Sequence, residues 1–406
     1  MSGEWGEAPS RRRFLQMGAG AVLGVASPAI IGSRTASAVA LRANRTPKVL
    51  FPPKLEWGQA GMRCVAGVRP ARNDGIRLGL DPALGRAGQH IIHNYGHSGA
   101  GITLSLGCAL RVGKAVEAFA GPPSKTAATP NVAIIGSGVA GLTVARELKA
   151  LWPKMKIRIL TKSQNVADCT SQVAGGQFAP SGVIASYERP PRMGILIGLL
   201  KDSATRVKEF VAAGTAAGYG IRQRFNYSGK DLADFKPFVP DVYAPPLKGP
   251  LPFANLSTVE GFEYDTWLIE PPIFLEALRR ELVGKGVVFR WGHPVADVEA
   301  IRALPETIVI NCSGLGARAL VGDGTVYGIK GQLVVMKNTT NLKYFVSGCG
   351  GAKSASYFFG RSNDMVAGGT YDYYNETTTV DTSDCRAILA RMKSIFNGNA
   401  DPCMVL

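Results

Sequence analysis

Three glycines at a fixed spacing carry the clearest chemical meaning in this sequence. Gly136, Gly138 and Gly141 form a G-x-G-x-x-G pattern directly after the apolar run 131–135 and before the helix-forming run 142–151. In such a turn the first glycine lets the chain reverse, the second admits a pyrophosphate and the third lets helix and strand pack closely. The pattern predicts a dinucleotide site; the alternative is a tight turn without a ligand.

The second strand of this unit, expected at 157–160, is followed by an unusual set of side chains. An Asp or Glu at this point usually binds the ribose hydroxyls. Here the positions hold Thr161, Lys162 and Ser163. Either hydroxyl could bind the ribose, or Lys162 could meet a phosphate, or Lys162 could be solvated and the ribose held elsewhere.

The elements around these residues indicate a Rossmann-type unit and a second, sheet-based domain. An apolar run at 62–68 predicts a strand that stops at 69–72, because Pro70 cannot donate to a central ladder. The residues that follow, through Gln89, are expected to form a loop. The stretch 225–262 is rich in Pro, Phe and Tyr, which indicates that it belongs to the second domain.

A long motif precedes the glycine turn. Residues 91–101 read IIHNYGHSGAG, and Gly107-Cys108-Ala109 follows after five residues. This run resembles the signature of the D-amino-acid oxidase family. Further stretches are also similar to that family: 67–72, 131–142, 169–176, 311–317, Gly331-Gln332, and Tyr357, which lies eleven residues before Gly368-Gly369. The resemblance covers roughly residues 60–120 and 131–400.

The order of these stretches departs from the family's order. The family's FAD strand comes first and its His-Asn-Tyr-Gly signature last, whereas here the signature comes first. The sequence therefore predicts a circular permutation, with residues 121–130 as a Pro-flanked linker between the two parts. Cuts in exposed loops are tolerated because domain termini are often close. Ten extended residues span at most about 35 Å.

The resemblance implies an α/β fold (α+β overall) with a Rossmann-type FAD-binding domain and an antiparallel-sheet substrate domain, both discontinuous. The expected division is as follows: 1–38 signal; 39–120 permuted segment; 121–130 linker; 131–220 and 271–322 FAD-binding domain; 221–270 and 323–385 substrate domain; 386–406 C-terminal helix and tail.

The resemblance also implies roles for three catalytic-site residues. Arg69 would bind the substrate α-carboxylate as a bidentate fork, and its alternative is an interdomain salt bridge. Tyr357 would donate its hydroxyl to the same carboxylate, and its alternative is a core aromatic. The Gly99 carbonyl would accept from the substrate amine.

The cofactor implied is FAD. Residues 98–103 would present backbone donors to the pyrimidine side of its ring, which stabilises negative charge on the reduced form. The residues expected to bind FAD are Gly136, Ser137, Gly138, Ala140, Gly141, Thr161, Lys162, Cys169, Thr170, Ser171, Gly175, Gly176, Gln177, Val295, Ser313, Gly314, Ser98, Gly99, Ala100, Gly101, Ile102 and Thr103.

Other polar residues near these motifs have weaker meaning. The family's second active-site tyrosine is replaced by Lys353. Lys353 or Arg361 could pair with an acidic substrate side chain, although the sequence slightly favours both being solvated. His93 and His97 have Gly and Ser as neighbours and no adjacent carboxylate, so no metal site is expected.

The activity implied is oxidative deamination of a D-amino acid. Hydride would pass from Cα to FAD, dioxygen would become hydrogen peroxide, and the product would hydrolyse to a 2-oxo acid and ammonia. Two alternatives keep the fold: an oxidase of D-aspartate, D-glutamate, glycine or a secondary amine, and an inactive exported flavoprotein. A homodimer is possible.

The N-terminus predicts export by the twin-arginine route, to the periplasm or the outside. Residues 10–16 read SRRRFLQ, the run 17–31 is weakly apolar, and Ala36-Ser37-Ala38 and Ala38-Val39-Ala40 offer cleavage sites. The alternative, a membrane anchor, suits this short, Gly-rich run poorly, and no later segment has the length of a span.

The net charge of +16 accompanies no nucleic-acid motif, so a nucleic-acid partner is not expected. The seven cysteines form no C-x-x-C pair, and their pairing cannot be assigned.

Overall fold

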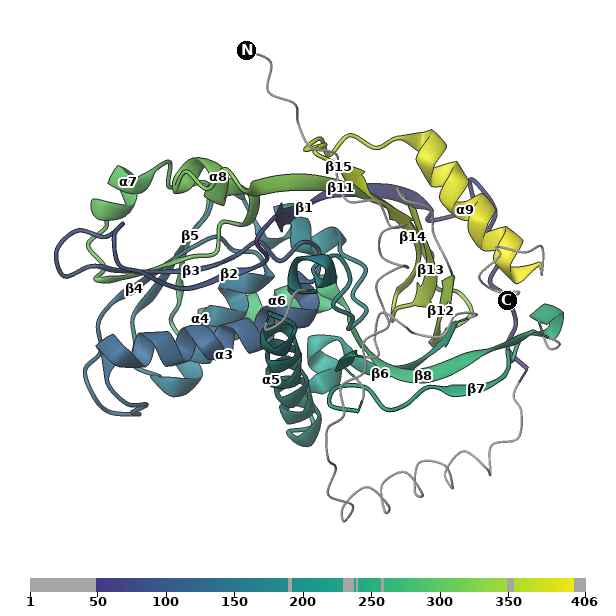
Figure 1. Ribbon diagram of the computed structural model, residues 1–406, viewed down its shortest axis with the longest axis horizontal. Coiled ribbons are helices and arrows are strands. Elements are labelled where there is room, and N and C mark those ends of the chain that lie inside the picture. The colour runs from purple at the N-terminus through teal and green to yellow at the C-terminus, as the bar shows by residue number, and fades with distance from the viewer. Residues whose placement is uncertain are drawn as a thin grey trace.

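The computed structural model describes residues 49–188, 192–228, 237–238, 240–256, 259–348 and 354–397. Two β-sheets form two lobes that lie side by side in Figure 1. One sheet has six strands and the other has nine. The expected signal at 1–38 and Lys353 lie outside the described residues.

The six-stranded sheet has the order β2-β3-β10-β4-β5-β9. Its strands are β2 (Arg77–Asp81), β3 (His90–Tyr95), β4 (Val132–Ile135), β5 (Ile157–Leu160), β9 (Val288–Arg290) and β10 (Ile308–Asn311). All neighbours are parallel except β2, which is antiparallel to β3. The carboxyl ends of the parallel strands therefore open at one edge, where ligands of such sheets bind.

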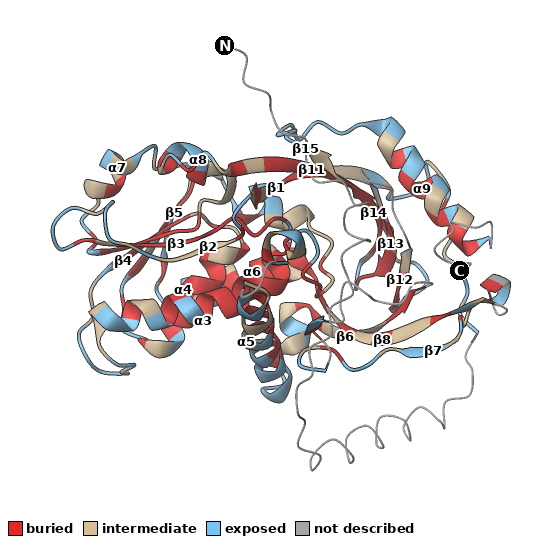
Figure 2. Ribbon diagram, in the orientation of Figure 1, coloured by how far each residue is buried: buried red, intermediate tan, exposed pale blue. Residues whose placement is uncertain are grey.

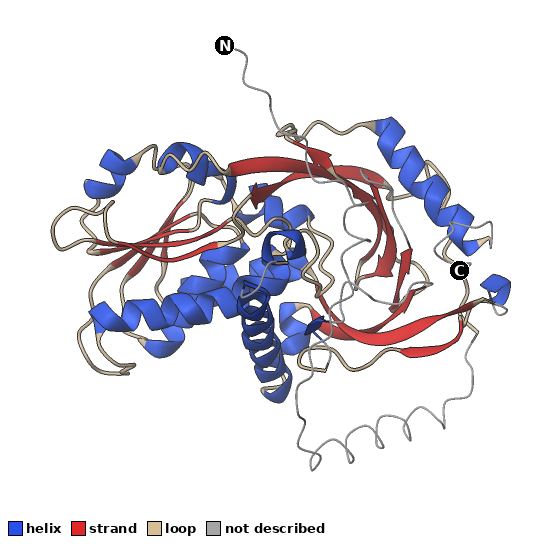
Figure 3. Cartoon of the chain, in the orientation of Figure 1, coloured by secondary structure: helices blue, strands red, loops and turns tan. Residues whose placement is uncertain are grey.

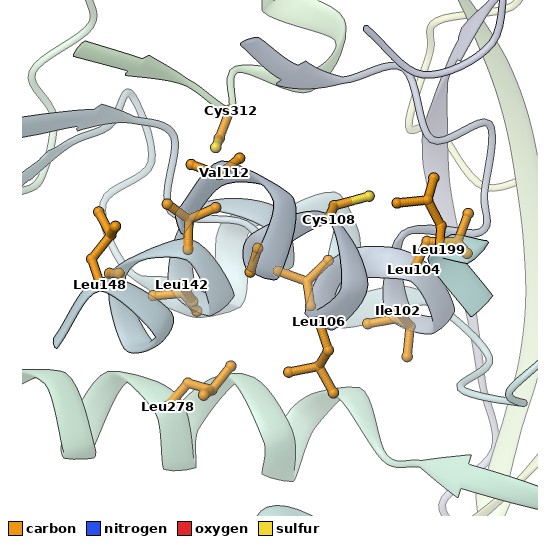
Figure 4. Close-up of a cluster of buried hydrophobic side chains, with 14 of the residues drawn as sticks. Ile102, Leu104, Leu106, Cys108, Val112, Leu142, Leu148, Leu199, Leu278 and Cys312 are labelled. Carbon is orange, nitrogen blue, oxygen red and sulfur yellow. The ribbon is translucent and has the colours of Figure 1, made fainter. Parts of the chain in front are cut away.

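Helices cover both faces of this sheet because its central strands are apolar on both sides. One face packs on α3 (Gly101–Ala120), α4 (Val139–Leu151) and α6 (Pro271–Gly284), and α5 (Arg192–Ala212) packs on α3. Figure 4 shows side chains from these helices meeting in one cluster. The other face packs on the short helices α7 (Val298–Arg302) and α8 (Ala317–Leu320).

The nine-stranded sheet has the order β1-β11-β14-β13-β12-β6-β8-β7, with β15 also paired to β11. Its pairs are antiparallel except β12 with β6. Its strands are β1 (Arg63–Arg72), β6 (Ile221–Ser228), β7 (Leu247–Pro250), β8 (Glu260–Ile269), β11 (Val326–Lys337), β12 (Tyr344–Gly348), β13 (Ser354–Gly360), β14 (Asp364–Thr370) and β15 (Asp372–Tyr373).

The helix α9 (Thr382–Phe396) covers the outer face of β11, β13 and β14. Its buried residues form a second core with the strands beneath it, and its other side is exposed (Figure 2). Short 3₁₀ turns lie at Val166–Asp168, Thr170–Val173, Ile184–Tyr187, Ala216–Tyr219, Ala254–Leu256 and Gly314–Gly316. Figure 3 shows that most of the helices lie in the lobe of the six-stranded sheet.

The N-terminal segment supplies strands to both sheets. β1 pairs with β11 in one lobe, and β3 pairs with β10 in the other. Residues 121–130 form neither helix nor strand and join α3 to β4. The predicted α/β class is confirmed, with a Rossmann-type sheet and a second, mostly antiparallel sheet.

Two local expectations were wrong. β1 does not stop at Val68 but runs through Pro70 to Arg72. Pro70 is tolerated because β1 is an edge strand. On its open side there is no second strand that would need the N–H that proline lacks. The expected loop before Gln89 contains β2, which forms a hairpin with β3. Among the described residues, no helix combines the length and apolar character needed to cross a bilayer.

Candidate active site

The glycine turn lies at the carboxyl end of β4 and is shaped by close contacts. Gly136 has a φ of 109°, and a Cβ there would lie 2.4 Å from the Cys312 carbonyl oxygen. A Cβ at Gly141 would lie 2.0 Å from the Gly136 oxygen, so neither position accepts a side chain. A Cβ at Gly138 would meet only the Ser171 Oγ, at 3.4 Å. Gly138 is therefore not required by protein packing, and its backbone faces space that a ligand can use.

Two helix N-termini meet at this turn. A Cβ at Gly101, the first residue of α3, would lie 3.5 Å from Cγ1 of Val139, the first residue of α4. Neither helix has a side-chain cap from its N-cap residue or an acidic residue in its first turn. Ser171 Oγ accepts a hydrogen bond from the Val139 N–H at 3.2 Å. The converging N-termini favour an anionic group such as a pyrophosphate.

The residues after β5 lie beside this turn. Ser137 Oγ donates to Thr161 Oγ1 at 3.0 Å, and the Ser163 N–H donates to the same oxygen at 3.2 Å. The sulfur of Cys169 lies 3.4 Å from Ser137 Oγ, and burial raises the pKa of the Cys169 thiol. Lys162 is exposed. The buried Thr161 hydroxyl is already held by protein, which leaves Ser163 and Lys162 as the side chains at the rim.

The remaining predicted cofactor residues border the same edge. Val295 is half-buried in the cluster on the far face of β4 and β5, and the N–H of His293 just before it donates to the Thr161 oxygen at 2.8 Å. Ser313 Oγ donates to Asn311 Oδ1 at 2.7 Å. A Cβ at Gly314 would lie 3.6 Å from Pro70. These residues lie in the segments that follow β9 and β10.

The loop 169–177 runs between the two sheets. Val173 lies against β1, because a Cβ at Gly67 would be 2.5 Å from its Cγ2, and a Cβ at Gly175 would be 3.2 Å from Phe359. Gln177 forms an isolated β-bridge with Leu268. The buried Oε1 of Gln172 has no hydrogen-bond partner in the described part of the chain. A buried orphan acceptor at this place suits a ligand that donates to it.

The segment 98–103 connects the cofactor turn to Arg69. Ser98 has a φ of 51°, and its N–H donates to the Pro70 oxygen at 2.9 Å. A Cβ at Gly99 would lie 2.7 Å from Cδ of Arg69, so glycine is needed there. The Thr103 hydroxyl donates to the Ala179 oxygen at 2.9 Å, so its side chain is held by the protein. The backbone of this segment stays next to the N-terminus of α3.

Arg69 is a half-buried cation held by carbonyl oxygens and an aromatic ring. Its Nη1 donates to the Thr370 oxygen at 3.0 Å, and its Cζ lies 4.4 Å from the centroid of the Tyr371 ring. It packs directly on Gly331, where a Cβ would lie 2.3 Å from Nη1. None of the described carboxylates forms an ion pair with it, so the alternative of an interdomain salt bridge finds no partner among these residues. Its charge remains available to an anionic ligand.

Tyr357 reaches the same place from β13. A Cβ at Gly368 would lie 2.2 Å from its Cζ and one at Gly369 would lie 3.0 Å from its hydroxyl, so the glycine pair makes room for the ring. The ring stacks on Phe359 with centroids 5.8 Å apart. Burial raises the pKa of Tyr357 above its ordinary value, and the Arg69 cation opposes this only in part. Tyr357 is therefore a neutral hydroxyl donor at ordinary pH.

Two basic residues, Arg361 and Lys353, were considered as partners for an acidic side chain of the substrate. Arg361 is neither solvated nor free, because it is buried and paired with Asp364 at 2.5 Å. Lys353 lies outside the described residues. Within the described ranges, no group of three or more His, Cys, Asp or Glu side chains gathers as metal ligands.

Sequence reasoning missed two contacts. The Tyr371 ring over Arg69 was not foreseen. Asp81 of β2 lies 3.2 Å from His93, although no carboxylate is adjacent to His93 in sequence. His93 in turn lies 3.3 Å from the Asn311 amide, which leads to Ser313. The alternation in Arg77–Asp81 was the signal that could have revealed β2 and this contact.

Comparison with known proteins identifies the family of this chain. The model of a family described as FAD dependent oxidoreductase (DAO) matches residues 131–404. The chain belongs to this family. The match begins after the linker, so it does not include β1, β2, β3 or α3.

Several curated proteins resemble this member of the FAD dependent oxidoreductase family. A D-amino acid oxidase of Dugesia ryukyuensis is 27% identical over 290 residues, which cover 68% of this chain and 80% of the relative. A D-aspartate oxidase of Homo sapiens is 25% identical over 286 residues, which cover 65% of this chain and 75% of the relative. A D-amino-acid oxidase of Streptomyces coelicolor is 26% identical, with coverage of 65% and 77%. Among solved structures, a glycine oxidase from Bacillus cereus ATCC 14579 aligns with a TM-score of 0.48 at 17% identity, covering 65% of this chain and 77% of that one.

The described residues fit the cofactor of this family. The open backbone at Gly138, the two helix N-termini without an acidic residue in their first turns and the orphan acceptor of Gln172 suit an anionic dinucleotide. As a member of this family, the chain is an FAD-dependent oxidoreductase. The substrate would lie beside Arg69 and Tyr357, on the side of the nine-stranded sheet that carries the loop 169–177.

Proposed function

We propose that this protein is a D-amino-acid oxidase, which converts a D-amino acid to a 2-oxo acid, ammonia and hydrogen peroxide. The observation that carries the proposal is the meeting of Arg69, Tyr357 and the Gly99 backbone at one place. A cation without a carboxylate partner, next to a neutral hydroxyl donor, suits a carboxylate ligand. The curated relatives named D-amino acid oxidase and D-aspartate oxidase support the same class.

The residues of the chain would act mainly by positioning. Arg69 would bind the α-carboxylate of the substrate through two parallel N–H bonds, and Tyr357 would donate a third. The Gly99 carbonyl would accept from the substrate amine. Three fixed contacts around one carbon orient its C–H bond and its face, which distinguishes a D- from an L-amino acid. The bound FAD would supply the hydride acceptor.

The test is an anaerobic mixing experiment on the protein loaded with FAD. Addition of a D-amino acid should bleach the visible flavin absorbance, and readmission of dioxygen should restore it with release of hydrogen peroxide. The matching L-amino acid is the control and should leave the spectrum unchanged. Bleaching by the L-enantiomer alone would overturn the proposal.

The class of side chain is a second question for the same assay. Arg361 is already paired with Asp364, so it adds no argument for an acidic substrate. A panel of neutral D-amino acids, D-aspartate, D-glutamate, glycine and sarcosine would separate the related oxidases. No bleaching with any member of the panel, from protein that retains FAD, would favour the inactive flavoprotein instead.

We also propose export by the twin-arginine route, on the basis of residues 10–38. That route carries folded proteins, so FAD could be loaded before transport. Release of peroxide outside the cytoplasm would limit damage to the cell. Replacement of Arg11, Arg12 and Arg13 by Lys should keep the protein in the cytoplasmic fraction; an unchanged distribution would contradict export by this route.

A further inference from the structure

Two cysteines from opposite ends of the chain lie on one face of the nine-stranded sheet. Cys64 is the second residue of β1, and Cys385 lies in the first turn of α9. Both belong to the buried cluster between that sheet and α9. Cys64 is half-buried and Cys385 is fully buried. Neither is part of the site formed by Arg69 and the cofactor turn.

The strand register places Cys64 under α9. Cys64 is opposite Val334 and Ala66 is opposite Gln332 in the antiparallel pair of β1 and β11. Opposite residues in such a pair point to the same face. The Gln332 side chain points at the start of α9, because its Nε2 donates to Asp384 at 2.6 Å and its Oε1 accepts from the Asp381 N–H at 2.6 Å. Cys64 therefore points to the same face, toward the helix.

The start of α9 is fixed in this position. Asp381 is its N-cap and accepts from the Ser383 N–H at 2.8 Å. The guanidinium of Arg386 lies 4.1 Å from the centroid of the Trp57 ring, which belongs to the segment that leads into β1. Residues on both sides of Cys385 thus hold the helix against the N-terminal segment. Burial raises the pKa of the Cys385 thiol, and a hydrogen bond with the neighbouring Cys64 thiol raises it further.

From this geometry we infer that Cys64 and Cys385 form a disulfide under oxidising conditions, which ties the first strand of the folded protein to its last helix. The bond would fix β1, the strand that also carries Arg69 on its other face. In the chain-entropy picture, a cross-link between residues so far apart in sequence restricts the unfolded chain strongly. The two cysteines would thus form a redox-dependent staple.

The oxidation needs a two-electron acceptor, for which hydrogen peroxide suffices. Peroxide reaches the half-buried Cys64 first: an S–O bond forms, the O–O bond of the peroxide breaks, and the thiol proton leaves with the second oxygen as water, which gives the sulfenic acid. The Cys385 sulfur then attacks the Cys64 sulfur, the S–S bond forms, the S–O bond breaks, and a second water leaves. The two thiols together lose two protons and two electrons. Because burial disfavours the Cys385 thiolate, the second step should be faster at alkaline pH.

The test is peptide mapping of the FAD-loaded protein after treatment with added hydrogen peroxide. Free thiols are alkylated in denaturant, and the protein is digested without reductant. We expect a cross-linked peptide pair containing Cys64 and Cys385, lighter than the two peptides together by two hydrogen atoms, which disappears on reduction. The oxidised protein should also melt about 5 °C or more above the reduced one.

Variants separate this staple from other thiol chemistry. Cys64→Ser and Cys385→Ser should each abolish the cross-link and the peroxide-dependent rise in melting temperature. Cys108→Ser is the control, since Cys108 is a free thiol buried in the core beside the six-stranded sheet, and it should keep both. If the variants do not fold, the peptide map of the unaltered protein still decides.

Full alkylation of both thiols after peroxide treatment, or a cross-link that joins either one to a different cysteine, would overturn the inference. The outcome does not depend on the proposed oxidase activity, because the peroxide is added and no turnover is required. A protein that is stapled but does not oxidise D-amino acids would contradict only the proposed function.

Discussion

At the residue scale, the position of Arg69 makes the sharpest prediction. A half-buried guanidinium whose described partners are two carbonyl oxygens and a ring keeps its charge uncompensated until an anion binds. Truncation of one partner of such a pair costs about 2–5 kcal/mol. Arg69→Ala should therefore lower kcat/KM for a D-amino acid by about 10³-fold. Arg69→Lys should recover only part of this, because an ammonium cannot form the bidentate fork.

The control for this prediction is on the same strand. Arg63 is exposed, and its one ion pair within the described residues is a distant one with Asp364, at 3.8 Å. Arg63→Ala should keep the kinetics of the unaltered protein, and all three variants should keep the visible flavin spectrum. Equal turnover by Arg69→Ala and the unaltered protein would remove Arg69 from the substrate site.

A second residue-scale prediction concerns His97 and pH. Burial lowers the pKa of His97 from 6.5 to about 4. Between these values the unfolded chain binds a proton that the folded protein excludes, so the free energy of unfolding should decrease as the pH falls from 6.5 to about 4. The contribution is about 3 kcal/mol over this window. His97→Gln cannot titrate and should show a shallower decrease in urea unfolding, with His293→Gln, at an exposed position, as the control. Identical slopes for His97→Gln and the unaltered protein would contradict the assignment.

At the scale of elements, local patterns predicted the parts that local chemistry determines. The glycine turn, the strand 131–135 and the helix after it follow from the spacing of Gly136, Gly138 and Gly141. The grouping of Arg69, Gly99 and Tyr357 came from resemblance, because no local pattern says that β1 and β13 lie near one another. The end of β1 was wrongly predicted at Pro70. A proline is tolerated in an edge strand, and local sequence does not show which strand lies at the edge of the sheet. β2 was missed because two of its five residues are charged and one is Gly.

The glycines of the turn allow packing and ligand binding to be tested separately. Gly138→Ala places a Cβ 3.4 Å from Ser171 Oγ, an ordinary contact, whereas Gly141→Ala places one 2.0 Å from a carbonyl oxygen. Gly138→Ala should therefore fold with a nearly unchanged melting temperature of the apoprotein but bind FAD at least about 10-fold more weakly, because its methyl group occupies pyrophosphate space. Gly141→Ala should lower the melting temperature itself.

Flavin fluorescence titration and thermal unfolding of the apoproteins measure these two effects independently. Unaltered FAD affinity in Gly138→Ala would show that the pyrophosphate does not approach this turn. A Gly141→Ala apoprotein as stable as the unaltered one would show that α4 can move away from β4, against the close packing seen here.

At the scale of the whole molecule, the N-terminal segment joins the two lobes. Residues 63–120 complete both sheets, with β1 on β11 and β3 on β10, and α3 then packs between α4 and α5. The two ends of the described chain also lie together, since Leu50 packs in the same cluster as Ile395 and Phe396 (Figure 1). A circular permutation requires such proximity, because the unpermuted order would join these two segments directly.

This proximity makes the proposed permutation testable by reversing it. A chain that begins at residue 131, runs to 397 and continues through a short Gly-Ser linker into 49–120 keeps every strand pair and the core residues Leu50 and Leu55, while it removes residues 121–130. Because the sheets and cores are unchanged, it should fold, bind FAD and melt within about 5 °C of the natural order. Residues 131–397 alone are the control: without β1 and β3, the edges of β11 and β10 are open, and this fragment should be insoluble. If the reordered chain is as insoluble as the fragment, residues 121–130 are needed for folding. They would then not be a simple linker between two segments whose order can be exchanged.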